Sequence, residues 1–312
     1  MVTWDPAAWL EYKKSCIGRN GAHQARLRVW ENNLEIYREG GYKTRSGKEI
    51  RLDNHEALEG TRVYAAPIAT DAIPTVPGGT VTGTGNIDCI ELGRGALLLG
   101  YSPLILNFSG IEKPNGMVDK GFQAQEEAIC RRTNLAQALS QYYTPEWAAT
   151  VSVPHRENRY PLDPLHGSVY TPGVTVFRTG EFLGCDLLEE PFRLAFVSNG
   201  AIKKRQEADF DASDGQITRE RIRTVFGVGL DRGHDCLILG GWGCGAFKNP
   251  VKVMAQLFKE VSMEPAFESR YRAVWFACLE KSSRTKDPRN GKFAPFYNLF
   301  GTLPKSVVHL PY

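Results

Sequence analysis

The sequence lacks the patterns that mark membrane proteins, disulfide-rich scaffolds and common metal sites. No uninterrupted apolar run approaches the ~20 residues that a membrane-spanning helix needs. Its seven cysteines are odd in number, widely spaced and never in a C-x-x-C pair, so neither a disulfide framework nor a zinc knuckle is indicated. An H-E-x-x-H motif is also missing, and we expect no metal.

An excess of charge of one sign is missing too. The 38 Lys and Arg residues against 35 Asp and Glu give a net charge of +3, which argues against a surface built for nucleic acid or anionic membranes. An anionic ligand therefore has to be bound locally. The amino terminus carries charges and no apolar signal core, which predicts a cytoplasmic protein, or a nuclear one in a eukaryote.

What the chain does contain is 42% hydrophobic residues in 312, enough for a sizeable core. Apolar runs that resemble buried strands alternate with segments of helical periodicity. Strands are predicted at 63–68, 104–108, 193–198, 236–239 and 271–279, the first of them as an edge strand because it contains a proline. Helices are predicted at 23–38, 86–99, 125–139, 219–232 and 250–261, and loops at 70–84, 141–172 and 199–218.

Strands that are apolar on both faces and interleaved with helices predict a three-layer α/β/α sandwich with a mixed central sheet. We expect one core with appendages. The predicted division is an N-terminal helical extension over 1–60, a core domain over 61–281 and a C-terminal tail over 282–312.

A cluster of glycines follows the predicted strand at 236–239. The segment 240–245 reads G-G-W-G-C-G and precedes a predicted helix, so its backbone N–H groups can approach a phosphate, aided by the helix dipole. It is not a Walker loop, because Lys248 is followed by Asn249. A tight turn without a ligand is the alternative interpretation. Phe247 either stacks on a ribose or base, or packs in the core.

A pair of carboxylates, Glu126 and Glu127, begins the predicted helix at 125–139. Acidic residues are stabilised at a helix N-terminus, so a solvated first turn is one interpretation. A flexible loop, 113–124, joins the strand ending at Phe108 to the pair, and this favours a functional role. Paired carboxyl groups suit glycosidic-bond hydrolysis, in which one donates a proton to the leaving oxygen and a carboxylate stabilises the oxocarbenium charge.

These motifs resemble those of the microbial-type poly(ADP-ribose) glycohydrolases, whose catalytic domain is a macrodomain-like α/β/α sandwich. The resemblance extends from about Arg26 to Leu279. It is carried by the segments 106–108, 124–127, 170–174 and 233–247, of which the last is the most specific.

The resemblance implies that ADP-ribose lies across the carboxyl ends of the strands, with its diphosphate between the two loops. It assigns Glu127 as the general acid/base and Glu126 as the residue that holds the ribose at the cleaved bond, with no cofactor and no metal. The substrate is then poly(ADP-ribose) or an ADP-ribosylated protein. The residues expected to bind ADP-ribose are Asn107, Lys113, Asn115, Gly116, Met117, Gln125, Gly173, Val174, Gly241, Trp242, Gly243, Cys244, Gly245, Ala246 and Phe247.

One loop departs from the family pattern. The family has three consecutive glycines where this chain has Asn115-Gly116-Met117, and an Asn where it has Lys113. Asn115 can adopt a positive φ, whereas Met117 is expected to bring a side chain toward the ligand. Two functions follow: a glycohydrolase, or a binding module that recognises ADP-ribose without cleaving it. A nucleotide-dependent oxidoreductase is a weaker third, because no acidic ribose partner follows a first strand.

Overall fold

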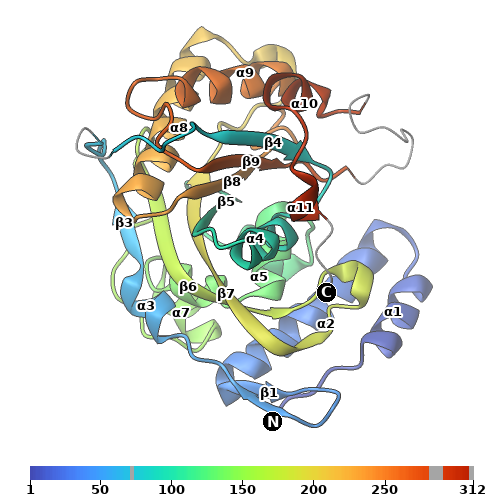
Figure 1. Ribbon diagram of the computed structural model, residues 1–312. Helices are drawn as coiled ribbons and strands as arrows, with labels where there is room; N and C mark the ends of the chain where they lie inside the picture. The colour runs from blue at the N-terminus through green and yellow to red at the C-terminus, as the bar shows by residue number, and fades with distance from the viewer. Residues whose placement is uncertain (71–73, 281–290, 309–312) are drawn as a thin grey trace. The chain divides into compact units, whose positions relative to one another are not determined.

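The computed structural model describes residues 1–70, 74–280 and 291–308 (Figure 1). Its main sheet has seven strands in the order β3-β6-β7-β5-β8-β9-β4. The strands are β3 (Arg62–Tyr64), β4 (Val81–Gly85), β5 (Pro103–Ser109), β6 (Ser168–Arg178), β7 (Leu187–Gly200), β8 (Cys236–Gly240) and β9 (Ala273–Ala277).

The sheet is mixed, as the sequence predicts. β4 pairs in parallel with β9, β9 with β8, and β8 with β5. β6 and β7 are neighbours joined by residues 179–186, and so short a connection makes an antiparallel pair, because a parallel crossover needs about a dozen residues or more. The predicted α/β class and mixed sheet are confirmed, and β3 is an edge strand as expected.

Contacts within the chain divide it into two compact units. The first unit comprises Met1–Val63, Ser109–Leu162 and Thr171–Ala195. The second unit comprises Tyr64–Phe108, Asp163–Tyr170 and Phe196–Tyr312. The division of the chain at 60 and 281 remains a prediction, and residues 282–290 and 309–312 of the predicted tail lie outside the described part of the chain.

The first unit is mainly helical. Its elements are α1 (Pro6–Ser15), α2 (Gly18–Glu39), β1 (Gly41–Lys43), β2 (Glu49–Arg51), α3 (His55–Gly60), η1 (Val118–Lys120), α5 (Gln125–Arg132), α6 (Leu135–Ser140), α7 (Pro145–Thr150) and η2 (Glu181–Leu183). The predicted helix at 23–38 lies within α2, which ends at Gly40 in the left-handed conformation. Trp30 and Tyr37 from α2 pack with Phe177 from β6 in the core of this unit.

The predicted helix at 125–139 is interrupted, so one helix is replaced by two. Thr133 and Asn134 separate α5 from α6 and pair with β6 instead. The Asn134 backbone N–H donates to Thr175 O at 3.2 Å, and the Thr175 N–H donates to Asn134 Oδ1 at 2.8 Å. Tertiary pairing with a strand outweighs the local helical pattern here.

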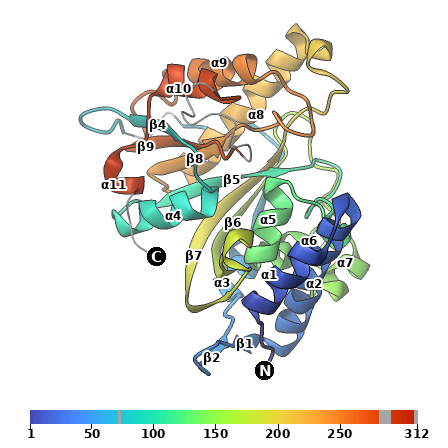
Figure 2. The ribbon, with the colours of Figure 1, turned by 90° about the vertical axis from the view of Figure 1, so that its right-hand side faces the viewer.

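The second unit places helices on both faces of its strands. Its helices are α4 (Cys89–Leu98), η3 (Glu207–Asp209), α8 (Ala212–Asp231), α9 (Val251–Ser262), α10 (Ala294–Phe300) and α11 (Lys305–Val308). Figures 1 and 2 both show α9 and α10 on one face of β4, β8 and β9, with α4 on the opposite face. Phe258, Phe276 and Phe296 pack ring against ring under α9 and α10.

Three predicted loops contain regular structure. The loop predicted at 70–84 is wrong from Val81 onward, where β4 begins. A Cβ at Gly83 would lie 2.8 Å from Leu303 Cα, so the glycine that suggested a loop is required where the chain approaches β4 closely. The loop predicted at 141–172 contains α7 and the start of β6. The loop predicted at 199–218 ends at Asp211, whose side chain caps α8 by accepting the Asp214 N–H at 3.0 Å.

The described helices also bear on membrane insertion. None of them combines the length and the apolar character that crossing a membrane requires.

Candidate active site

The predicted carboxylate pair begins helix α5 in the first unit. Glu126 and Glu127 are its second and third residues, and their exposed fractions are only 3% and 6%. The loop expected to face them, which includes Asn115, Gly116 and Met117, contacts both carboxylates. A solvated first turn of a helix is therefore wrong for these residues. Burial of two carboxylates requires hydrogen-bond donors, and the loop supplies them.

Glu126 is oriented by two donors. Its Oε1 accepts the Ser109 hydroxyl at 2.9 Å and the Asn115 backbone N–H at 2.9 Å. Ser109 is the last residue of β5, so the sheet itself fixes one of these donors. Ser109 was not among the predicted site residues, although its position directly after Asn107-Phe108 at a strand end could have indicated it.

Glu127 is oriented by two backbone donors. Its Oε1 accepts the Met117 N–H at 3.0 Å and its Oε2 accepts the Ala124 N–H at 2.9 Å. The bond from Ala124 is half of a capping box, in which the third residue of a helix reaches back to the residue before it. Each carboxylate oxygen can accept more than one hydrogen bond, so these contacts leave acceptor capacity for a substrate hydroxyl or a water.

Gly116 is the position at which the loop touches the carboxylates. A Cβ there would lie 2.4 Å from Glu127 Oε1 and 3.2 Å from Glu126 Oε2. Its φ is +54°, in the left-handed region. Only glycine therefore satisfies both the backbone conformation and the space at this position.

The residues that flank Gly116 keep the backbone in this shape without being glycines. Asn115 has a φ of +67°, as the sequence led us to expect. Its side chain is fully buried, and its Nδ2 donates to Ser140 Oγ at 2.9 Å. Met117 has a φ of −122°, which needs no glycine, and its side chain is half-buried. With Asn115 and Met117 in place of glycines, the backbone N–H groups of both residues still donate to the carboxylates.

Two neutral groups lie near the pair. Burial, together with the negative charges of Glu126 and Glu127, raises the pKa of the Cys130 thiol well above its usual range. Burial and the charge of Glu126 likewise raise the pKa of the Tyr160 phenol. Both groups therefore stay protonated at neutral pH and add no charge beside the carboxylates.

The glycine turn, defined here as residues 241–247, follows β8 in the second unit. Its glycines are required by close contacts: a Cβ at Gly241 would lie 2.2 Å from the Phe293 ring, and one at Gly243 would lie 2.3 Å from Asn249 Nδ2. Gly243 also has a φ of +74°. A helix follows the turn as predicted: α9 begins at Val251, one residue after the predicted start.

Several N–H groups of the glycine turn have no acceptor in the described part of the chain. Among the residues that the structure describes, the backbone N–H groups of Gly243, Gly245, Ala246 and Phe247 donate to no protein acceptor. Gly245 and Ala246 are exposed, and Phe247 is half-buried. Successive free N–H groups form a concave donor surface for an anion.

The framework of the glycine turn is buried. Trp242 is 1% exposed, and its indole N–H donates to Asn199 O at 3.2 Å. Cys244 is also buried, and burial raises the pKa of its thiol to about 12. The Asn249 side-chain amide donates to Ile202 O at 2.7 Å and to Gly243 O at 3.1 Å. These two hydrogen bonds link the turn to the residues that follow β7.

The other predicted site residues are divided between the units. In the first unit, Lys113 and Gln125 are half-buried. Gly173 lies against Glu56, because a Cβ at Gly173 would be 2.4 Å from the Glu56 carboxyl carbon. Val174 is fully buried in β6. In the second unit, Asn107 is also fully buried and donates to Ser198 Oγ at 3.0 Å.

Thiols and side chains that could bind a metal are the other groups with chemical potential. All seven cysteines fall within the described residues and are free thiols. In residues 1–70, 74–280 and 291–308, no three His, Cys, Asp or Glu side chains gather in a way that could hold a metal ion.

The fold and the carboxylate pair define a class, the mixed α/β proteins with a macrodomain-like sheet. A family model described as microbial-type PARG, catalytic domain, matches residues 31–179. These 149 residues of the chain are therefore similar to the microbial-type PARG catalytic domain. A search of curated proteins finds no match.

Solved structures of bacterial poly(ADP-ribose) glycohydrolases are similar to this chain. One from Thermomonospora curvata is 27% identical, with a TM-score of 0.73, and the match covers 89% of this chain and all of that one. A structure of the same protein bound to the inhibitor ADP-HPD is 28% identical, with a TM-score of 0.67, covering 87% and 98%. The enzyme from Deinococcus radiodurans, in complex with ADP-ribose, is 24% identical with a TM-score of 0.61, covering 80% and 97%, and supports the fold.

Proposed function

We propose that this protein is an ADP-ribosyl glycohydrolase that cleaves a ribose O-glycosidic bond of poly(ADP-ribose) or a related ADP-ribose conjugate. The observation that carries the proposal is the buried pair Glu126 and Glu127, which is oriented by four hydrogen-bond donors from nearby segments of the same chain. Carboxyl groups fixed in this way are the groups that glycosidic-bond hydrolysis requires. Similarity to bacterial poly(ADP-ribose) glycohydrolases supports the same chemistry.

In the proposed reaction Glu127 acts as general acid and then as general base. Its protonated carboxyl donates a proton to the leaving ribose oxygen as the C–O bond breaks, which leaves an oxocarbenium-like ribose. Glu127 then removes a proton from the attacking water, and the new hydroxyl completes ADP-ribose. Glu126 holds the ribose at the cleaved bond, and the substrate diphosphate helps to stabilise the positive charge.

The glycine turn is proposed to bind the diphosphate of ADP-ribose. Its N–H groups at Gly243, Gly245, Ala246 and Phe247, which donate to no acceptor among the described residues, can donate to phosphate oxygens. Phe247 is proposed to pack on the ligand. No cofactor or metal enters this scheme.

The loop at 115–117 favours a hydrolase over a binding module. Asn115 and Met117 replace two glycines of the family pattern, and their backbone N–H groups donate to Glu126 and Glu127. These contacts support a catalytic role for the pair over a role in binding alone.

The decisive experiment compares the wild-type chain with Glu127→Gln. Release of ADP-ribose from poly(ADP-ribose) and from ADP-ribosylated protein is measured by chromatography, and binding of ADP-ribose by calorimetry. General acid–base catalysis contributes ~10²–10⁴-fold, so the variant should lose at least about a hundredfold in rate while it still binds ADP-ribose.

A matched control is Glu189→Gln, which changes another carboxylate of the first unit that lies on the surface. We expect it to retain the wild-type rate. Equal rates for wild type and Glu127→Gln would reject the assignment of Glu127. Binding of ADP-ribose without release by the wild type would instead identify a binding module.

A further inference from the structure

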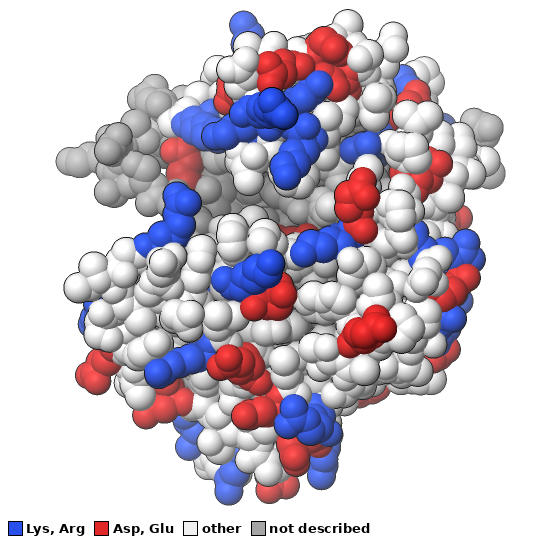
Figure 3. Space-filling view, turned by 180° about the vertical axis from the view of Figure 1, so that it is seen from behind, with Lys and Arg blue, Asp and Glu red and all other residues white. Residues whose placement is uncertain are grey.

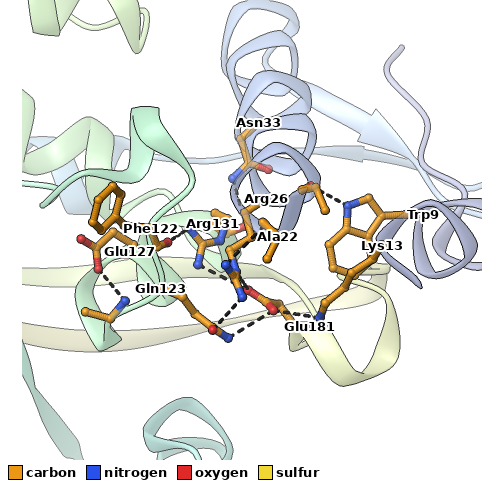
Figure 4. A network of polar contacts seen from close by, with 12 residues as sticks. Trp9, Lys13, Ala22, Arg26, Asn33, Phe122, Gln123, Glu127, Arg131 and Glu181 are labelled. Carbon is orange, nitrogen blue, oxygen red and sulfur yellow. Dashed lines mark hydrogen bonds and ion pairs between the residues drawn. The ribbon is translucent and has the colours of Figure 1, made fainter. Parts of the chain in front are cut away.

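A cluster of charged and polar side chains lies near Glu127 in the first unit (Figure 4). Its centre is Glu181 of η2, whose carboxylate accepts Arg26 Nε at 2.7 Å and Lys13 Nζ at 2.9 Å. Arg131 Nη2 lies 3.5 Å from the same carboxylate, and Gln123 Nε2 donates to it at 3.2 Å. We call these five residues the Glu181 cluster.

The Glu181 cluster forms hydrogen bonds with the segment that precedes α5, the helix that carries Glu127. Arg26 Nη2 donates to Gln123 Oε1 at 2.6 Å, and Arg131 Nη1 donates to Phe122 O at 2.7 Å. Gln123 is followed by Ala124, whose backbone N–H donates to Glu127 Oε2. A chain of direct hydrogen bonds and one peptide link therefore joins the cluster to the Glu127 carboxylate.

Packing adds to this restraint. A Cβ at Gly121 would lie 2.1 Å from His23 O, so the loop lies directly against helix α2. The Phe122 ring stacks on His23 with 4.7 Å between ring centroids. The segment 121–124 is thus held against α2 by packing and by Arg26.

The three cations of the cluster keep the Glu181 carboxylate ionised. Burial opposes the charge of Glu181, but Arg26, Lys13 and Arg131 outweigh it and lower the pKa of this carboxyl. The Arg131 side chain is only 1% exposed, so its guanidinium depends on such partners. Lys13, Arg26 and Glu181 all lie outside the 31–179 range that the family model matches.

We propose that Arg26 and Glu181 are positioning residues for Glu127. Through Gln123 they fix the segment 122–124 and hence the direction of the Glu127 carboxylate, which makes helices α1 and α2 part of the catalytic apparatus. The proposal rests on the proposed function for its effect on rate, while the restraint on the segment can be tested without activity. It assigns a role to the N-terminal helices that packing alone would not require.

The test uses the full chain with Arg26→Gln, Gln123→Ala and the double variant. Gln123 is exposed, so its replacement does not disturb the core. Misplacement of a catalytic group by about 1 Å can cost ~10²-fold, so each single variant should lower kcat about tenfold, with KM and ADP-ribose affinity within about twofold of wild type. Because both changes break the same link, the double variant should be no slower than the singles.

Arg45→Gln is the control, since it removes a surface ion pair with Asp186 in the same unit and shares no residue with the cluster. It should leave kcat unchanged. Hydrogen exchange of the peptide containing 122–124 is measured in parallel, and it should be faster in Arg26→Gln and Gln123→Ala than in wild type or Arg45→Gln.

The outcomes are distinct. Wild-type kcat in both single variants, or losses that multiply in the double variant, would overturn the proposal. A parallel loss of kcat and melting temperature with unchanged exchange at 122–124 would also overturn it, because it would indicate a structural role. If the wild type releases no ADP-ribose, the proposed function fails, and exchange alone decides whether the cluster fixes this segment.

Discussion

The carboxylate pair and the glycine turn use backbone N–H groups in opposite ways. At Glu126 and Glu127 the N–H groups of Asn115, Met117 and Ala124 are occupied by side-chain carboxylates. In the glycine turn, N–H groups of described residues such as Gly243 and Gly245 have no protein acceptor. The pair is organised by the protein alone, whereas the turn has donors left for an anion.

This difference indicates which role each region suits. Preorganised groups lower an activation barrier because they need no rearrangement during the reaction. Unoccupied donors, by contrast, contribute to affinity when an anion replaces water. Substitutions at the pair should therefore affect kcat, and substitutions at the turn should affect binding.

The largest effect is expected for Gly116→Ala. The new Cβ would lie 2.4 Å from Glu127 Oε1, and the φ of +54° adds about 1 kcal/mol of backbone strain. The carboxylates must move, so kcat for ADP-ribose release should fall about a hundredfold or more, as measured by steady-state kinetics. A normal kcat in this variant would contradict the role of preorganised carboxylates, because catalysis would then not depend on their fixed geometry.

A smaller effect is expected for Gly243→Ala in the glycine turn. A Cβ there would lie 2.3 Å from Asn249 Nδ2, in a residue with a φ of +74°. The turn should distort, and the Kd for ADP-ribose measured by calorimetry should rise about tenfold, which corresponds to the loss of about one hydrogen bond to a charged group.

Gly245→Ala serves as the control for the turn. A Cβ at Gly245 meets nothing within 4 Å, and Gly245 is not among the residues with positive φ. Its melting temperature should equal that of the wild type, while Gly243→Ala should melt lower. Equal stability of both variants would show that contacts at Gly243 do not shape the turn.

A moderate pH-dependent effect is expected for Glu181→Gln, which weakens the support of the pair. The pKa of Glu181 is lowered in the folded protein, so its stabilisation is complete above the ordinary value of 4.5 and is lost as pH falls through the lowered pKa. The variant should be less stable by about 1–2 kcal/mol at pH 7. Denaturant unfolding should show this difference narrowing below about pH 4.5. A difference that grows in acid would contradict the assignment.

The smallest effect concerns the thiols of the two regions. Burial raises the pKa of both Cys130, near the pair, and Cys244, in the turn. Neither should react with iodoacetamide at neutral pH, whereas Cys16 is half-buried and more accessible. Mass spectrometry of the native protein should find modification at Cys16 first. Rapid labelling of Cys130 or Cys244 would mean that its region opens.

The sequence predicted strands better than loops. β5, β8 and β9 follow from continuous apolar runs, because strands buried on both faces need apolar residues throughout. β4 was missed because Gly83 and Gly85 suggest a loop, and their purpose is visible only where residue 303 packs against them. The break in the helix at Thr133 and Asn134 likewise depends on a distant strand.

By itself the sequence determined the α/β class, the glycine turn after β8 and the presence of two adjacent carboxylates at a helix start. These depend on local pattern, which neighbouring residues encode. Tertiary structure alone decided that Ser109 donates to Glu126, that Gly116 lies against both carboxylates, and that Arg26 and Glu181 fix the segment before them. Such contacts join residues far apart in the chain, and their distances are fixed only when the core packs and buried charges find their donors.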